Sequence, residues 1–99
     1  MKKIIFSLVL CVMLGSLRAT PAPLTIGAIY NLTGTQSALD VPSSQGALLA
    51  VSQINKAGGL LGRPIKLIVK NGQSNPIVIN KIADAFAKNP AISTVIGLS

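Results

Sequence analysis

The chain has 99 residues, with nine lysines and arginines, two acidic residues, no histidine and a formal net charge of +7. This length allows one small domain at most. Asp40 and Asp84 are far apart in the sequence, so metal sites and acid–base pairs lack their usual side chains, and we expect no enzyme, no metal and no cofactor. From Lys56 onward the basic residues are scattered singly, which argues against a nucleic-acid partner.

The first residues have the layout of a secretory signal peptide. Lys2 and Lys3 precede an apolar run, Ile4–Leu14, which is followed by small and polar residues. The run is too short for a transmembrane helix, which needs about 20 apolar residues. We expect cleavage of residues 1–19 and a periplasmic protein. The sole cysteine, Cys11, lies in the removed segment, so no disulfide or lipid anchor is expected.

After this segment the chain begins with a strand and a polar loop. Leu24–Tyr30 is nearly continuous and apolar, as a buried parallel strand should be, and Gly27 leaves room for close approach. Asn31–Asp40 is predicted to be a loop because it is rich in turn residues. Ser43 or Ser44 can then cap the helix that follows, by accepting a hydrogen bond from a free backbone amide.

The next segment predicts a helix, a glycine stop and a second strand. The helix covers Gly46–Ala57, and Gly58 and Gly59 end it, because glycine accepts the left-handed conformation of a C-cap. Gly62 permits a tight turn before the strand Ile65–Val69. The residues of the expected apolar stripe recur at helical spacing, whereas Asn55 lies off it: Ala47, Leu48, Val51 and Ile54.

The last segment predicts a second helix and a third strand. Asn75 caps the helix and Pro76 takes its first position, where no backbone donor is needed. Phe86 lies on its apolar side, and Thr94–Gly97 begins the third strand. Right-handed crossovers place the two helices on opposite faces only if the strand order is 2-1-3. The fold class is therefore α/β, a Rossmann-like parallel sheet with the order β-α-β-α-β.

Five stretches, in this order, resemble the leucine/isoleucine/valine-binding-protein family, the type I periplasmic binding proteins of ABC transporters. They are Ile26–Gly34 (IGAIYNLTG), Gly46–Ala50 (GALLA), Ile54–Asn55, Ala57–Gly59 (AGG) and Leu61–Ile65 (LGRPI). The resemblance covers nearly everything after residue 23. It implies that residues 20–99 are the first part of lobe 1 of a two-lobed fold, either as a fragment or as a truncated product.

The resemblance also implies a function and two ligand-facing positions. The whole protein would capture a small polar solute, an amino acid of the branched-chain type or an amide, and deliver it to an inner-membrane ABC permease. Ligands of open α/β sheets lie beyond the carboxyl ends of the strands, where the strand order reverses. By resemblance the ligand-facing residues are Leu39 and Ser99, although Leu39 could instead cover the core and Ser99 could be a turn hydroxyl.

The sequence departs from the family at two places, and it also allows several alternative functions. The family usually has proline where Asn31 stands, and it often has acidic residues where Lys70, Asn71 and Asn75 stand. Asn31 also begins a glycosylation sequon, for which turn formation is the preferred interpretation. The alternative functions are a ligand-sensing receptor domain of the same fold, a small α/β enzyme, or a nonfunctional truncated product with exposed sheet edges.

Overall fold

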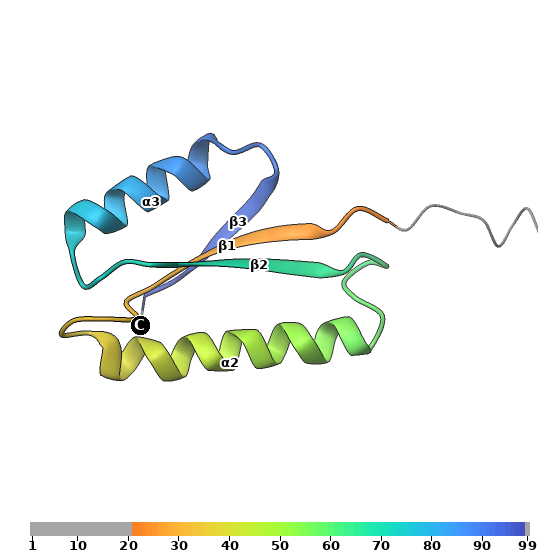
Figure 1. Ribbon diagram of the computed structural model, residues 1–99. Coiled ribbons are helices and arrows are strands. Elements are labelled where there is room, and N and C mark those ends of the chain that lie inside the picture. The colour runs from red at the N-terminus through yellow and green to blue at the C-terminus, as the bar shows by residue number, and fades with distance from the viewer. Residues whose placement is uncertain (1–20, 99) are drawn as a thin grey trace, which may run out of the picture.

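The computed structural model describes residues 21–98, so the expected signal peptide, residues 1–19, and Ser99 lie outside the described residues. Three parallel strands form one sheet in the order β2-β1-β3, which confirms the predicted topology. The helices cover opposite faces of this sheet (Figure 1). The elements are β1 (Leu24–Tyr30), α2 (Ser37–Lys56), β2 (Ile65–Asn71), α3 (Pro76–Lys88) and β3 (Ile92–Gly97).

The central strand carries the core. β1 pairs with β2 from Leu24 opposite Ile65 to Tyr30 opposite Asn71, and it pairs with β3 on its other side. Because β1 is covered by a neighbouring strand on each side and a helix on each face, its second half is buried. The buried apolar side chains are Ala28, Ile29, Tyr30, Ile65 and Phe86. Strand β1 matches its predicted bounds, and β2 and β3 are each two residues longer than predicted.

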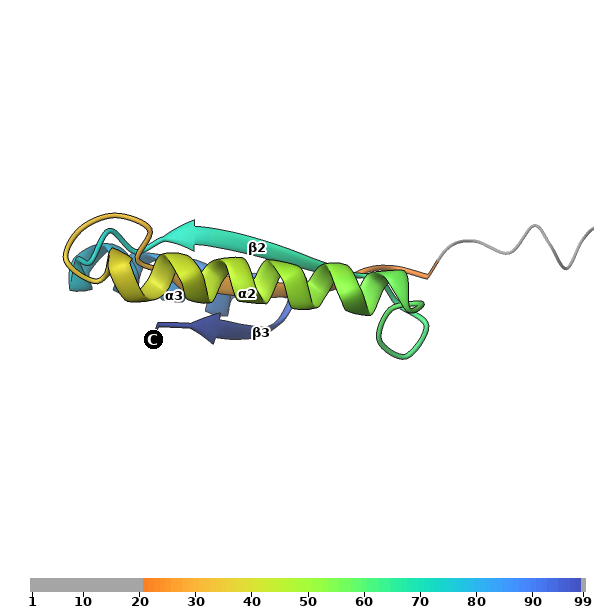
Figure 2. The same ribbon diagram turned by 90° about the horizontal axis from the view of Figure 1, so that it is seen from below.

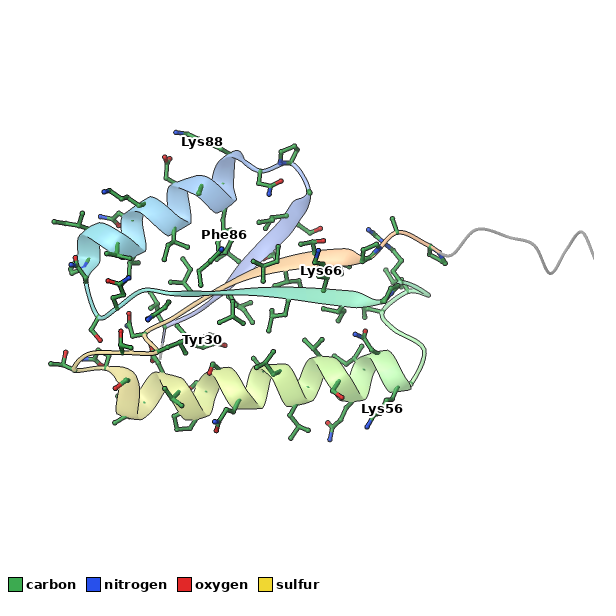
Figure 3. The ribbon with its side chains drawn as sticks, viewed as in Figure 1. Tyr30, Lys56, Lys66, Phe86 and Lys88 are labelled. Atoms are coloured by element: carbon green, nitrogen blue, oxygen red, sulfur yellow. The ribbon has the colours of Figure 1, made fainter. Side chains whose placement is uncertain are left out.

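Gly27 allows α3 to lie close to the sheet. Phe86 points from α3 toward the strands (Figure 3) and is 6% exposed. A Cβ atom at Gly27 would lie only 2.8 to 3.0 Å from three carbon atoms of the Phe86 ring. Real Cβ atoms essentially never make contacts below 3.0 Å. The close approach predicted at Gly27 is therefore made by the aromatic ring of Phe86.

The helix after β1 begins earlier than predicted. α2 begins at Ser37 and contains Pro42, so residues 37–40 are helical rather than part of a loop, and the prediction that Ser43 or Ser44 caps the helix is wrong. Their hydroxyls instead donate to carbonyls of the preceding turn, at 3.0 and 2.7 Å. The early start depends on hydrogen bonds to Asp40 and to other elements, which are described below, and these offset the helix-breaking tendency of the proline.

The side of α2 that faces the sheet is more polar than predicted. Asp40 and Ser44 are buried, whereas Leu48, a member of the expected stripe, is 50% exposed. Asn55, expected off the stripe, donates to the carbonyl of Ile65 at 2.9 Å and accepts from its amide at 2.7 Å. Polar side chains at both ends of the helix thus satisfy backbone groups at strand ends, a role that apolar periodicity does not reveal.

The carboxyl end of α2 has the predicted glycine stop. The amide of Gly58 donates to the carbonyl of Asn55 at 3.2 Å, and that of Gly59 donates to Ile54 at 2.9 Å. These two bonds, with positive φ at Gly58, form a Schellman motif. A tight turn follows at residues 60–63, with positive φ at Leu61 and Gly62, as a type I′ turn requires.

Arg63, at the end of this turn, binds the residues before β1. Its Nε donates to the carbonyl of Ala22 at 3.0 Å, and its Nη2 donates to the carbonyl of Pro23 at 3.1 Å. The amide of Leu24 donates to the carbonyl of Pro64 at 2.8 Å. The start of β1 is therefore attached to the amino end of the sheet by both side-chain and backbone hydrogen bonds.

The second helix begins and ends as predicted. The side chain of Asn75 accepts from the amide of Ile77 at 2.9 Å, Pro76 takes the first helical position, and Asn89 is the C-cap. Lys88 forms an exposed ion pair with Asp84 at 2.8 Å. The start of α3 could be predicted from the local sequence, because the cap, the proline and the helix are contiguous.

Candidate functional site

The candidate site is the end of the sheet where the strands finish. The strand order reverses at β1, because β2 pairs with one edge of β1 and β3 pairs with the other edge. The loop after β1 leads to α2, which covers one face of the sheet. In Figure 2 the arrowheads of β2 and β3 lie at the same end of the molecule as the beginning of α2. The amide of Leu98 donates to the carbonyl of Ile29 at 3.0 Å, which keeps the chain after β3 beside the end of β1. In open α/β sheets this position is where ligands bind.

Asn71, the last residue of β2, binds the loop after β1, residues 31–36. Its Oδ1 accepts from the amide of Leu32 at 2.9 Å and from that of Gln73 at 2.8 Å. Its Nδ2 donates to Oγ1 of Thr33 at 3.1 Å. A primary amide can accept and donate at once, so one side chain connects the two loops.

Ser74 makes a second connection between the same loops. Its Oγ donates to the carbonyl of Thr33 at 2.8 Å and accepts from the amide of Gln36, the N-cap of α2, at 3.0 Å. Its backbone amide donates to Oδ1 of Asn31 at 2.9 Å. A Cβ at Gly34 would lie 2.7 Å from the Ser74 hydroxyl oxygen, so the glycine leaves room for this contact.

Asn31 is buried against the neighbouring loop. It is 5% exposed, and a Cβ at Gly72 would lie 2.6 Å from its Oδ1. Its backbone amide donates to Oδ2 of Asp40 at 2.7 Å. Asp40 is fully buried and lies in the first turns of α2, where the positive end of the helix dipole favours a carboxylate. The burial of Asn31 supports its assignment as a turn residue, because the sequon asparagine is covered in the folded chain.

The structure places one of the two predicted ligand-facing residues. Leu39 lies in the first turn of α2, not in a loop, and is 60% exposed. It therefore does not cover the core, which was the alternative interpretation. Ser99 lies outside the described residues. Asn71 and Ser74 were not predicted as site residues. Their only signal was a run of turn-forming polar residues directly after a strand.

The exposed polar groups of the loops after β1 and β2 are uncharged, whereas the exposed Lys70 lies one residue before the end of β2. The loops after β1 and β2, residues 31–36 and 72–75, carry hydroxyl, amide and backbone groups, and Asp40 beneath them is buried. Lysines 56 and 88 lie at the other ends of their helices (Figure 3). Within residues 21–98 there is no enclosed pocket and no group of three potential metal ligands. No helix in this range is long and apolar enough to cross a bilayer.

An open parallel sheet with polar loops at its switch point is the arrangement at which α/β domains bind ligands. A sequence model of the family described as periplasmic binding protein matches residues 23–99. The chain belongs to this family, whose members bind solutes and are not enzymes. Members of this family are located outside the cytoplasm.

Solved structures agree with this assignment. The chain is similar to the branched-chain amino acid transporter substrate-binding protein LivJ from Streptococcus pneumoniae, crystallised with isoleucine, at 28% identity and a TM-score of 0.73 over 77% of this chain. An ABC transporter substrate-binding protein from Desulfitobacterium hafniense is 32% identical, with a TM-score of 0.67 over 79% of this chain. The match covers 22% of each of those proteins, so the chain spans about a fifth of their length.

A third structure shows the fold alone. The fatty acid ABC transporter substrate-binding protein from Thermomonospora curvata is 23% identical, with a TM-score of 0.70 over 78% of this chain and 19% of that one. The predicted fold, a β-α-β-α-β unit that matches part of a type I periplasmic binding protein lobe, is confirmed. The named ligands of these neighbours belong to different chemical classes.

Proposed function

We propose that residues 20–99 form the first part of one lobe of an exported solute-binding protein, which delivers its solute to an ABC permease in the inner membrane. The observation that carries this proposal is the family match over residues 23–99, on a sheet whose strand order reverses at β1. The proposal includes removal of residues 1–19 as a signal peptide and release into the periplasm. N-terminal sequencing of the protein from a periplasmic fraction should give Thr20 as the first residue, and retention of Met1 would contradict it.

We propose an amino acid of the branched-chain type, or a related amide, as the solute. The relative crystallised with isoleucine supports this class. The uncharged donors at the carboxyl ends of β1 and β2 suit a carboxylate, because preorganised amide and hydroxyl groups can replace its lost water. The exposed side chain of Leu39, in the first turn of α2, suits an aliphatic solute side chain.

Isothermal titration of the whole exported protein, expressed from the complete reading frame, tests the solute class. The panel contains the amino acids, their amides and a medium-chain fatty acid. We expect binding of leucine, isoleucine or valine. Binding of the fatty acid alone would replace the amino-acid assignment, and no binding across the panel would contradict the proposed function.

Two leucines on one helix provide a matched test of the contact residue. Leu39 and Leu49 are both 60% exposed on α2, but only Leu39 lies in the turn next to the candidate site. If Leu39 packs against the solute, Leu39→Ala should weaken the affinity for the preferred amino acid at least about tenfold. Leu49→Ala should leave it unchanged. Equal affinities of the two variants would remove Leu39 from the binding site.

A further inference from the structure

We infer that Asn71 and Ser74 are positioning residues for solute binding: they set the geometry of the loop at residues 31–36, and with it the first turn of α2. This inference rests on the proposed function, because it concerns the same edge of the sheet. Neither residue needs to touch the solute. Each acts through the loop that it binds.

The geometry consists of five hydrogen bonds between two loops that are far apart in sequence. Asn71 contributes the bonds to Leu32 and Thr33, at 2.9 and 3.1 Å. The Ser74 hydroxyl donates to the carbonyl of Thr33 at 2.8 Å and accepts from the amide of Gln36 at 3.0 Å. The backbone amide of Ser74, which an alanine variant retains, donates to the side chain of Asn31 at 2.9 Å. The bonded residues span the whole loop, from its first residue to the N-cap of α2.

The bond to Gln36 links the loop to the helix. Gln36 makes no side-chain cap hydrogen bond, so its own side chain does not fix the start of α2. Instead its backbone amide donates to the Ser74 hydroxyl, which comes from the loop after β2. The first turn of α2, which carries Leu39, is therefore attached to the neighbouring loop by the serine.

Preorganisation explains why this would change affinity. A loop that is ordered before the solute arrives does not have to be ordered at the expense of binding free energy. If the loop is in its binding-competent geometry for only a fraction of the time, the apparent affinity falls by that fraction. Removal of the hydrogen bonds from Asn71 or Ser74 should thus weaken binding without removal of any group that contacts the solute.

Asparagine and aspartate at position 71 differ in the hydrogen bonds that they can make. A carboxylate at position 71 could only accept hydrogen bonds, whereas the side chain of Asn71 accepts two and donates one. Asn71→Asp keeps both acceptor bonds and requires the hydroxyl of Thr33 to turn round and donate. It is therefore the conservative variant, and its affinity should lie near that of the wild type.

The test compares solute affinity and thermal stability in the whole exported protein. The variants are Asn71→Ala, Ser74→Ala and Asn71→Asp, and the matched control is Asn55→Ala. Asn55 also makes side-chain bonds to a strand end, at 2.9 and 2.7 Å, but at the opposite end of α2. Its loss should lower the melting temperature and leave the Kd unchanged. We expect Asn71→Ala and Ser74→Ala to raise the Kd roughly tenfold, as for a loop that is competent about a tenth of the time.

The outcomes separate this inference from the proposed function. Wild-type affinity in folded Asn71→Ala and Ser74→Ala, or an equal loss of affinity in Asn55→Ala, would overturn the positioning role while the solute-binding function stands. No solute binding by the wild-type protein would instead overturn the proposed function. If Asn71→Ala does not fold, Ser74→Ala gives the decisive Kd, and restoration of affinity by Asn71→Asp supports the role.

Discussion

Replacement of Gly27 by alanine should destabilise the fold through a single contact. The new methyl group would lie 2.8 to 3.0 Å from three ring carbons of Phe86. Carbon atoms pack best at about 3.5–4.0 Å, so the ring must retreat by roughly 0.5–1 Å. Because Phe86 is buried between α3 and the sheet, that retreat displaces the helix.

The expected cost follows from two opposing terms. Overpacking of a core contact costs about 1–3 kcal/mol. Replacement of glycine by alanine also lowers the conformational entropy of the unfolded chain, which stabilises the folded state by about 0.4–1 kcal/mol. The net loss in the free energy of unfolding for Gly27→Ala should therefore be about 1.3 kcal/mol from the midpoints of these ranges, and at most about 2.6 kcal/mol.

Urea unfolding followed by far-ultraviolet circular dichroism measures this loss. In a Phe86→Leu background the smaller side chain makes room for the methyl group, so Gly27→Ala should cost at least about 0.5 kcal/mol less there. Gly46→Ala is the control, since a Cβ at this helical glycine has no neighbour within 4 Å, and alanine there should stabilise by about 0.5–1 kcal/mol. The same cost for Gly27→Ala in both backgrounds would refute the contact with the Phe86 ring.

Three further substitutions test other parts of the fold by the same unfolding assay. Gly59→Ala should cost at least about 2 kcal/mol, because this residue has φ +84° and the new Cβ would clash with a backbone carbonyl. A cost below about 1 kcal/mol would contradict this clash. Asn75→Ala removes the N-cap of α3 and should cost about 1 kcal/mol, whereas exposed Asn80 on the same helix should tolerate alanine without loss. Lys88→Ala breaks only an exposed ion pair, so a change above about 1 kcal/mol would be unexpected.

Features with contiguous signals were predictable from the sequence. The bounds of β1, the Asn75 cap and the glycine stop after α2 each depend on residues that are neighbours in the chain. No single residue specified the strand order: with right-handed crossovers, 2-1-3 is the order that places the two helices on opposite faces of the sheet. These parts of the prediction are confirmed because local chemistry and chain geometry determine them.

Features that depend on distant partners were not predictable. The loop was predicted to end at Asp40, because Asn31–Asp40 is rich in turn residues and the serines before Gly46 are good caps. The helix nevertheless begins at Ser37, since Asp40 and Ser74 bond to the loop across 9 and 38 residues. The positioning residues of the candidate site escaped prediction for the same reason: their hydrogen bonds join two loops from separate strands.

The attachment of residues 22 and 23 by Arg63 has a practical consequence for sensor construction. The guanidinium binds the carbonyls of Ala22 and Pro23, at the end of the sheet remote from the first turn of α2 (Figure 1). A dye, affinity handle or fused reporter joined ahead of Ala22 would be tethered at that remote end. Such a tether can fix the protein to a surface with the loops after β1 and β2 facing the sample.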